Sequence, residues 1–213
     1  MTEPAAVPAR DAEQTRQRIL AAALDEFSAK GISGARVDTI AEQARVNKRM
    51  LYYYFGSKEE LFRAVLRARF AEAARDQESP PVRPSPADRL PALAERFASS
   101  PQYVRLLMWE ALERSADGEL EEEEIRRAVY RRWVETVADE HASRTDTAGD
   151  TSDGNAIDAA QLVLAEVAMT MFATAFPQVV RLVTGEDPDA PGFLAAQREF
   201  LAWAGARMQP HAP

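Results

Sequence analysis

The hydrophobic positions along the chain recur at helical spacing, and this pattern predicts one helix after another. Residues 15–30 carry one apolar stripe with the spacing i, i+1, i+4, i+5, i+8, formed by Ile19, Leu20, Ala23, Leu24 and Phe27. Gly31 follows where a helix commonly ends, because glycine accepts the left-handed backbone of a C-cap. A period-two alternation is nowhere sustained, so we expect no strands.

Three more helices are predicted before the first proline-rich stretch. Residues 37–44 show apolar positions on one face, and Asn47 is a good N-cap for a helix over residues 48–55. Ser57 and Glu60 have the spacing of a capping box, which opens a helix that continues past Phe70. These short helices form a compact N-terminal head.

A second group of helices follows a break in the pattern. Four prolines between Ser79 and Pro86 are too many for a helix interior and predict a short connector. Residues 143–154 are rich in Ser, Thr, Asp and Gly and predict a mobile loop. Further helices are expected at residues 87–99, 102–115, 120–141, 156–183 and 191–208. The prediction is an all-α chain with a flexible N-terminal tail over residues 1–11, a head over 12–70 and a helical body over 71–213.

The composition narrows the chemistry that such a chain can perform. Among the 213 residues there is no Cys, which excludes disulfides, Cys-ligated zinc and thiol nucleophiles. His141 and His211 are far apart and lack companion ligands, and the acidic run 119–124 is typical of a solvated helix start. We therefore expect no metal, no cofactor and no enzyme. No apolar run reaches the roughly 18 residues of a membrane span, which makes a cytoplasmic protein with no membrane partner the expectation.

The charge is divided unevenly along the chain. The net charge is −8, yet residues 10–69 carry 12 basic and 8 acidic residues, a net charge of +4. The remainder carries 14 basic and 26 acidic residues, a net charge of −12. This asymmetry favours a nucleic-acid-binding head on an acidic body, although uneven charge also arises from a solvated face alone.

The helices at 37–44 and 48–55 have the spacing of a helix-turn-helix. On the second helix, Leu51 and Phe55 lie four residues apart and are expected to be buried. The opposite face presents two cations and two tyrosines, and no acidic residue lies between Glu42 and Glu59. Cations neutralise phosphates and arginine can pair with guanine, so this face suits the major groove of DNA. It consists of Lys48, Arg49, Tyr52 and Tyr53.

The same spacing has a plainer interpretation. A generic helical hairpin would show it, and an isolated pair of tyrosines belongs to an ordinary core more often than to a DNA contact. Three tyrosines in a row, however, cannot all face one core, so at least one of residues 52–54 must project outward.

The stretch Val37–Leu61, VDTIAEQARVNKRMLYYYFGSKEEL, resembles the DNA-binding head of the TetR family of bacterial repressors. The resemblance extends over about residues 15–66 and implies a three-helix helix-turn-helix head. The turn departs from the family pattern Ala-Gly-Val-Ser, because it reads Ala44, Arg45, Val46 and Asn47. Arg45 must therefore accept an unusual backbone angle or a modified turn.

The resemblance also implies roles for individual residues. Arg36 would contact a phosphate, and the second helix would begin near the DNA backbone with Val37 and Asp38. Base edges would be touched by Lys48, Arg49 and Tyr52, and phosphates by Tyr53, Tyr54 and Lys58. Helical spacing favours Tyr53 as the outward tyrosine, whereas the family pattern favours Tyr54. Asp38 is unusual there; it would accept from a cytosine amino group or, as we expect, orient Arg36 or Arg49.

The resemblance implies a C-terminal body that dimerises through its last two helices and encloses an effector pocket. Independently, residues 162–182 are apolar around nearly the whole circumference of one helix, which favours burial against a second subunit. A central helix of a monomer is the alternative. The expected dimer interface comprises Leu164, Ala168, Met171, Ala175, Val179, Phe193, Phe200 and Trp203. The expected pocket is lined by Phe97, Tyr103, Leu107, Met108, Trp109, Met169 and Phe172, residue types that also fill ordinary cores.

The sequence thus predicts a ligand-responsive, sequence-specific DNA-binding transcriptional regulator. We expect a homodimeric repressor that a small-molecule effector releases from a palindromic double-stranded operator. An all-α enzyme is disfavoured, because no nucleophile, metal set or Gly-rich phosphate loop is present. A helical protein-interaction module without sequence-specific DNA binding is the alternative.

Overall fold

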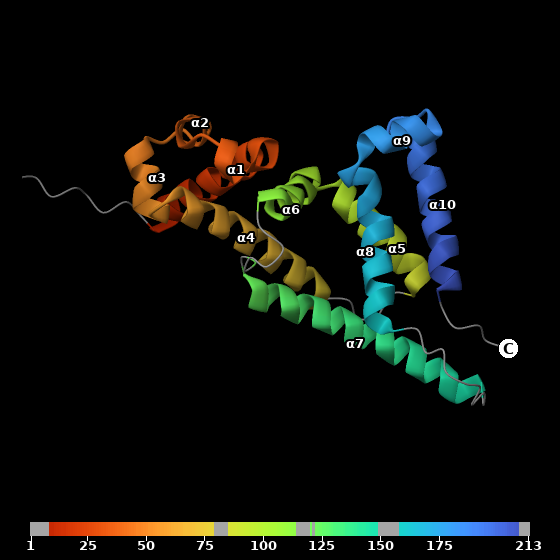
Figure 1. Ribbon diagram of the computed structural model, residues 1–213. Coiled ribbons are helices and arrows are strands. Elements are labelled where there is room, and N and C mark those ends of the chain that lie inside the picture. Colours follow the sequence, from red (N-terminus) through yellow and green to blue (C-terminus); the bar gives the residue numbers. More distant parts are fainter. Residues whose placement is uncertain (1–8, 79–84, 114–119, 121, 149–157, 209–213) are drawn as a thin grey trace, which may run out of the picture. The chain divides into compact units, whose positions relative to one another are not determined.

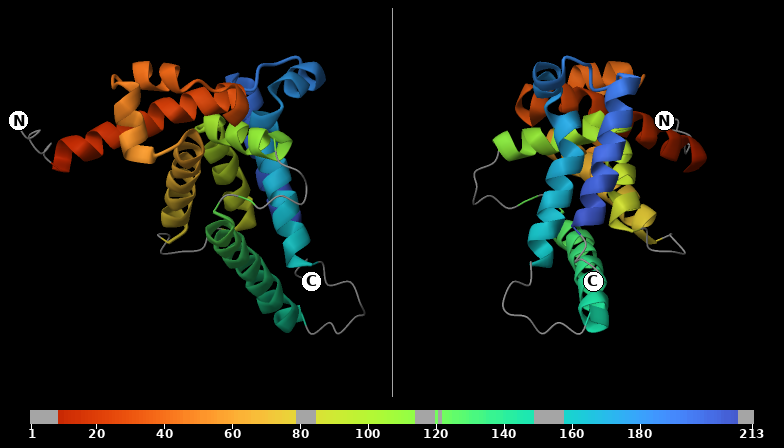
Figure 2. Two further views of the ribbon diagram at one scale, coloured as in Figure 1. Left: turned by 60° about the vertical axis from the view of Figure 1, so that its left-hand side comes forward. Right: turned by 90° about the vertical axis from the view of Figure 1, so that its right-hand side faces the viewer.

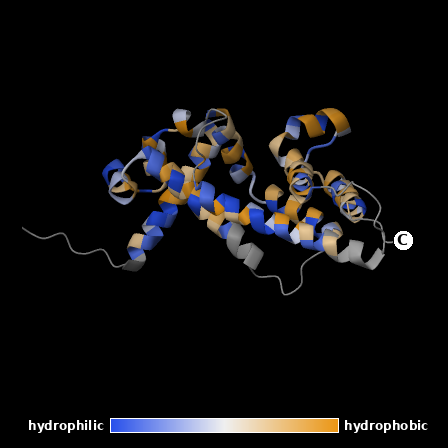
Figure 3. Ribbon diagram, turned by 60° about the horizontal axis from the view of Figure 1, so that its bottom comes forward, coloured by the Kyte–Doolittle hydropathy of each residue, from blue (hydrophilic) through white to orange (hydrophobic). Residues whose placement is uncertain are grey.

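The computed structural model describes residues 9–78, 85–113, 120, 122–148 and 158–208. Over these residues the chain forms ten α-helices and no strand, which confirms the all-α prediction (Figure 1). Apolar and polar residues are interleaved along most helices, as amphipathic packing requires (Figure 3). The chain divides into two compact units: unit 1 contains residues 1–73 and 105–123, and unit 2 contains residues 74–104 and 124–213.

Unit 1 contains the helix-turn-helix. Its helices are α1 (Ala9–Gly34), α2 (Val37–Gln43), α3 (Lys48–Phe55), most of α4 (Lys58–Glu78) and most of α6 (Pro101–Glu113). The rings of Phe27 and Phe62 meet edge to face with centroids 5.2 Å apart. Ile19, Phe27, Ile40 and Leu51 of the predicted apolar stripes are fully buried, and so are Leu61 and Leu66 of α4.

The start of α1 lies earlier than the sequence pattern predicts. The helix begins at Ala9, so the last residues of the predicted flexible tail 1–11 are helical. Residues 1–8 lie outside the described part of the chain.

The end of α1 is held by α6. Gly31 interrupts the helix with a φ of 69°, which confirms the predicted break. The backbone N–H groups of Ile32 and Ser33 donate to the Glu113 carboxylate at 3.2 and 3.1 Å. The Trp109 indole donates to the carbonyl oxygen of Ser28 at 3.2 Å. A Cβ at residue 31 would lie 2.8 Å from Cε3 of the Trp109 ring, so the positive φ and this close contact both favour glycine.

Unit 2 is built around α5 (Pro86–Ala98), which packs against α8 (Ala159–Ala175) and α10 (Pro191–Arg207) (Figure 2). Gly205 of α10 meets the first turn of α5 so closely that a Cβ would lie 2.3 Å from the Pro86 carbonyl oxygen. Two small apolar clusters fill this unit. The first cluster contains Leu90, Ala94 and Leu201, and the second contains Val137, Leu162 and Val163.

The prediction of one long apolar helix at residues 156–183 is wrong, because this stretch forms two helices. α8 ends at Ala175, and α9 (Pro177–Thr184) follows after a bend of 85°. Pro177 explains the break, because proline has no backbone N–H and disfavours helical geometry at the residue before it. Phe176 accordingly has φ −127° and ψ 60°.

The connection before α8 also differs from the prediction. α7 (Glu123–Ala148) continues through the first half of the predicted loop 143–154, and residues 149–157 lie outside the described part. No single helix in the described ranges is long and apolar enough to cross a membrane; α8 and α9 reach that length only as a bent pair.

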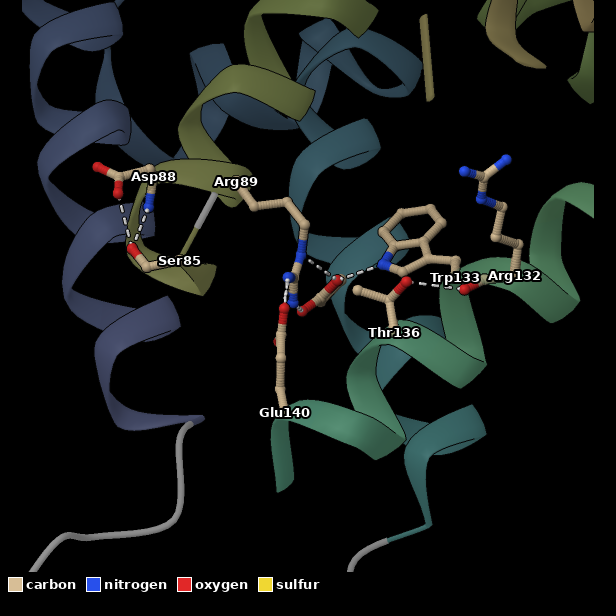
Figure 4. Close-up of polar contacts among 8 residues, drawn as sticks. Ser85, Asp88, Arg89, Arg132, Trp133, Thr136 and Glu140 are labelled. Carbon is tan, nitrogen blue, oxygen red and sulfur yellow. Dashed lines mark hydrogen bonds and ion pairs between the residues drawn. The ribbon is translucent and has the colours of Figure 1, made fainter. Parts of the chain in front are cut away.

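A buried ionic cluster joins three helices of unit 2 (Figure 4). Glu166 of α8 is 2% exposed and accepts from Arg89 Nη2 of α5 at 2.6 Å. The same carboxylate accepts from the Trp133 indole of α7 at 2.8 Å. Arg89 Nη1 also donates to Glu140 of α7 at 2.9 Å. Burial disfavours the charged guanidinium, yet the two carboxylates outweigh it and raise the pKa of Arg89.

Candidate nucleic-acid interface

The start of α3 is fixed by its N-cap. Asn47 has an extended backbone, and its side chain accepts the Met50 N–H at 2.7 Å, which confirms the predicted cap. Ser57 Oγ likewise accepts the Glu60 N–H at 3.0 Å at the start of α4. These side-chain caps satisfy backbone groups at both ends of the segment that carries α3.

The two faces of α3 differ as the spacing predicts. Leu51 is 0% and Phe55 8% exposed, so both belong to the core of unit 1. On the other face four polar or aromatic side chains are exposed to solvent. They are Lys48, Arg49, Tyr52 and Tyr53.

The three consecutive tyrosines separate by exposure. Tyr53 is 81% exposed and Tyr52 40%, whereas Tyr54 is half-buried. The Tyr54 ring contacts Tyr53 edge to face at 5.6 Å and Phe55 at 6.4 Å between centroids. Helical spacing therefore placed Tyr53 correctly, and Tyr54 supports the ring of Tyr53 from the side.

Asp38 of α2 pairs with the first residue of α3. Its Oδ1 lies 2.9 Å from Lys48 Nζ, and both side chains are half or more exposed. The expectation that Asp38 would orient Arg36 or Arg49 is thus wrong, because Lys48 lies across the turn within direct reach. The hydrogen bond that Lys48 donates to Asp38 and, after it, the negative charge of Asp38 raise the pKa of Lys48, so this lysine stays protonated at neutral pH.

The first residues of α2 are held by a buried carboxylate that the sequence did not single out. Glu26 of α1 is 4% exposed and accepts the backbone N–H of Arg36 at 3.0 Å and Lys30 Nζ at 2.9 Å. Burial raises its pKa, but these donors outweigh burial and the net shift is downward. The signal in the sequence was an acid directly beside the apolar stripe of α1. Glu26 leaves the exposed Arg36 side chain, and the half-buried Val37 after it, at the edge of the interface.

Lys58 and Arg45 lie on either side of α3 in the sequence and differ in their exposure to solvent. Lys58, at the start of α4, is half-buried, and its Nζ lies 3.4 Å from the carbonyl oxygen of Ser33. Arg45, in the turn, is exposed and has a φ of 55°. This angle confirms that the loss of the turn glycine forces an unusual backbone conformation on Arg45.

The residues predicted to line an effector pocket fall in both units. Leu107, Met108 and Trp109 belong to unit 1, where Trp109 is bonded to α1. The remaining four belong to unit 2. Phe97, Tyr103 and Met169 are half-buried there, while Phe172 is 47% exposed on the outer face of α8.

Comparison with known proteins places this geometry in a family. A family model described as "Bacterial regulatory proteins, tetR family" matches residues 19–65. The HTH-type transcriptional repressor SCO4008 of Streptomyces coelicolor is 38% identical over 178 residues, 83% of this chain and 87% of that protein. The HTH-type transcriptional repressor NicS of Pseudomonas putida is 39% identical over 118 residues, 52% of this chain and 55% of NicS. The crystal structure of a putative transcriptional regulator, SCO4942 of Streptomyces coelicolor, superposes with a TM-score of 0.69 at 30% identity, covering 93% of this chain and 99% of that one.

Proposed function

The chain belongs to the TetR family of bacterial regulatory proteins, and we propose that two copies bind a palindromic DNA operator and leave it when a small molecule binds. It is a ligand-responsive, DNA-binding transcriptional regulator, and its relatives SCO4008 and NicS are named as repressors. Repression is therefore the mode that we propose for this chain.

The outer face of α3 carries the proposal. Two cations and two tyrosines are exposed on one side of a short helix whose other side is buried. An α-helix fits the major groove, where arginine pairs with guanine O6 and N7 and a tyrosine ring meets a thymine methyl group. We assign base edges to Lys48, Arg49 and Tyr52, and phosphates to Arg36, Tyr53, Tyr54 and Lys58, with Val37 and Asp38 beside the DNA backbone.

The dimer contact is assigned to apolar stripes on unit 2. On α8, Leu164 is 62% and Phe172 47% exposed, and Ala168 lies between them on the same face. On α10, the rings of Phe200 and Trp203 stack 5.9 Å apart, and both are more than half exposed. Single exposed apolar residues are ordinary, but stripes of this kind mark interaction surfaces.

Not all residues expected at the dimer interface suit it equally. Met171, Val179 and Phe193 are half-buried within the chain, and Ala175 is already buried. Ala175 has little surface left for a partner. The proposed interface therefore consists of the exposed members, with Phe172 added from the residues first assigned to the pocket.

The effector site is assigned to half-buried apolar side chains of unit 2. Phe97, Tyr103 and Met169 combine aromatic and sulfur-containing surface with one hydroxyl, a composition typical of small-molecule sites. Binding there would favour one arrangement of the dimer over another, which is a shift of populations and involves no chemical step.

The DNA-binding function is tested by fluorescence anisotropy on DNA from upstream of the protein's own gene, beside random DNA and over a range of salt. Affinity that prefers one sequence and falls steeply with salt supports the proposal. Arg49→Ala should cost about 1–3 kcal/mol at one base position and relax the preference there. If the wild type binds no duplex at low salt, even one selected from a random pool, the chain is an interaction module instead.

The dimer is tested by sedimentation of the wild type and of Phe200→Asp. A carboxylate in the stacked pair should convert the dimer to a monomer with unchanged helical content. The matched control is Glu199→Asp, which conserves the charge at an exposed neighbour. A variant that remains dimeric would remove α10 from the interface.

A further inference from the structure

The turn between α2 and α3 closes with a pair of backbone hydrogen bonds that demands one left-handed residue. The Val46 N–H donates to the Ala41 carbonyl oxygen at 2.9 Å, and the Arg45 N–H donates to that of Glu42 at 3.0 Å. These two bonds are the Schellman closure of a helix C-terminus, whose left-handed position is usually glycine. In this chain the position is Arg45, with a φ of 55°.

An arginine is strained in this conformation. Glycine adopts a positive φ without strain, and asparagine or aspartate can offset it with a short polar side chain, whereas a long aliphatic stem cannot. Among the described residues, the only other non-glycine residue with positive φ is Glu122, and its carboxylate pairs with Arg67 Nε at 2.9 Å. No hydrogen bond or ion pair within the described part of the chain engages the Arg45 side chain. Strain that a local contact does not explain points to an external one.

The location of Arg45 indicates what that contact is. Its side chain is exposed, it precedes the first residue of α3 by three positions, and no acidic residue lies between Glu42 and Glu59. Nearby Lys48 is already paired with Asp38. Arg45 is therefore an uncommitted cation beside the helix that faces the major groove, and a guanidinium forms paired hydrogen bonds with phosphate oxygens.

We propose that Arg45 is an additional DNA-phosphate contact, retained at a strained backbone position for that purpose. The inference rests on the proposed function, because it requires a duplex against α3. The competing explanation is internal: a cation near the C-terminus of α2 interacts favourably with the helix dipole. The two explanations predict different results for DNA affinity and for stability.

Three variants separate charge from strain. Arg45→Lys keeps the charge, Arg45→Gln removes the charge at a residue that is strained in the same way, and Arg45→Gly removes both charge and strain. Arg131→Gln is the control for lost net charge, since Arg131 is exposed on α7 in unit 2. Each protein is titrated against a duplex that the wild type selects from a random pool, from about 50 to 200 mM salt, and its melting temperature is recorded.

We expect Arg45→Gln and Arg45→Gly to bind more weakly and to lose about two units of the salt slope, because each of the two subunits loses one phosphate contact. Their disadvantage against the wild type should accordingly shrink about 12-fold between 50 and 200 mM salt. Arg45→Lys and Arg131→Gln should keep the wild-type slope. Arg45→Gly should also melt about 2–4 °C higher than the wild type, so that affinity falls while stability rises.

Each other outcome decides against the proposal. If the wild type binds the duplex and Arg45→Gln keeps its affinity and slope, Arg45 contacts no phosphate. If that variant also melts lower than the wild type, Arg45 serves the helix dipole of α2. If the wild type itself binds no duplex, the proposed function fails and this inference fails with it.

Discussion

Each unit contains an ion pair between neighbouring helices, and the two pairs differ in their exposure to water. In unit 1, Asp38 and Lys48 meet at 2.9 Å in water, with half or more of each side chain exposed. In unit 2, Arg89 lies between Glu166 and Glu140, and Glu166 is 2% exposed. An exposed pair contributes little to stability and can exchange partners, whereas a buried pair cannot lose one partner without leaving a desolvated charge. The exposed pair therefore suits a surface that changes partners, and the buried cluster fixes three helices relative to one another.

The largest loss of stability is expected when the buried cluster around Glu166 is broken. Glu166→Leu leaves the Arg89 guanidinium with one carboxylate and the Trp133 indole without its acceptor. Loss of one buried partner should lower the free energy of unfolding by about 3–5 kcal/mol, measured by urea denaturation. Replacing Arg89 by Met together with Glu166 by Leu should recover much of the loss. A double variant as unstable as the single one would show that Arg89 does not carry the effect.

A smaller loss of stability is expected when a side chain is added where α5 and α10 approach closely. Gly205→Ala places a Cβ against backbone atoms of Pro86 and Ala87, which cannot move aside as a side chain can. Such overpacking should cost about 1–3 kcal/mol in thermal or chemical unfolding. The matched control is Gly34→Ala in unit 1, where the nearest contact is an ordinary 3.4 Å to Lys30 Cβ. Equal stabilities for the two variants would contradict the close approach.

Unit 1 contains a buried carboxylate, that of Glu26, and its contribution to the free energy of unfolding should depend on pH. The pKa of Glu26 is lowered in the fold, so its contribution to stability is present above the ordinary value of 4.5 and is lost as the pH falls below it. Glu26→Gln should therefore be less stable than the wild type at pH 7 and approach it at pH 3. The stabilities are measured by urea denaturation at both pH values. A constant difference between the proteins would remove Glu26 from the acid response.

The smallest change in stability is expected at the exposed pair. Asp38→Asn should leave the melting temperature unchanged, because water already solvates both partners. DNA affinity should rise, since Lys48 is freed and a repelling acid is removed in each subunit, and the salt slope should steepen by up to about two units for the dimer. Thr39→Ser, a neighbour on α2, serves as the control. Weaker DNA binding by Asp38→Asn would show that Asp38 positions Lys48 for its contact.

The sequence predicted most of the head and less of the body, for physical reasons. Caps and stripes are local signals, so Asn47, Leu51 and the outward Tyr53 were placed correctly from spacing alone. The pairing of Asp38 with Lys48 depends on how two helices cross, which spacing does not specify. Most of all, the contacts of Glu113 and Trp109 with α1 join residues about 80 positions apart, and no local pattern announces them.

In the body, the sequence-based prediction missed the break between α8 and α9 at Pro177. The uniform apolarity of residues 162–182 predicts one buried helix, but Pro177 divides the stretch, and Leu182 and Val183 are exposed on α9. The proline was visible in the sequence and was the signal that could have been used. The buried cluster around Glu166 was not foreseeable, because each of its three helices contributes a single charged residue.

The hydrogen bonds between Glu113 and the end of α1 can form only late in synthesis, because Glu113 is made about 80 residues after α1 ends. The ribosome makes α1 to α4 first, and at about 5–20 residues per second their completion precedes that of residue 113 by seconds. Until then the N–H groups of Ile32 and Ser33 lack the Glu113 carboxylate, and the Ser28 carbonyl lacks its indole donor. The end of α1 therefore lacks these contacts when it emerges, and a fragment that stops at residue 78 cannot form them.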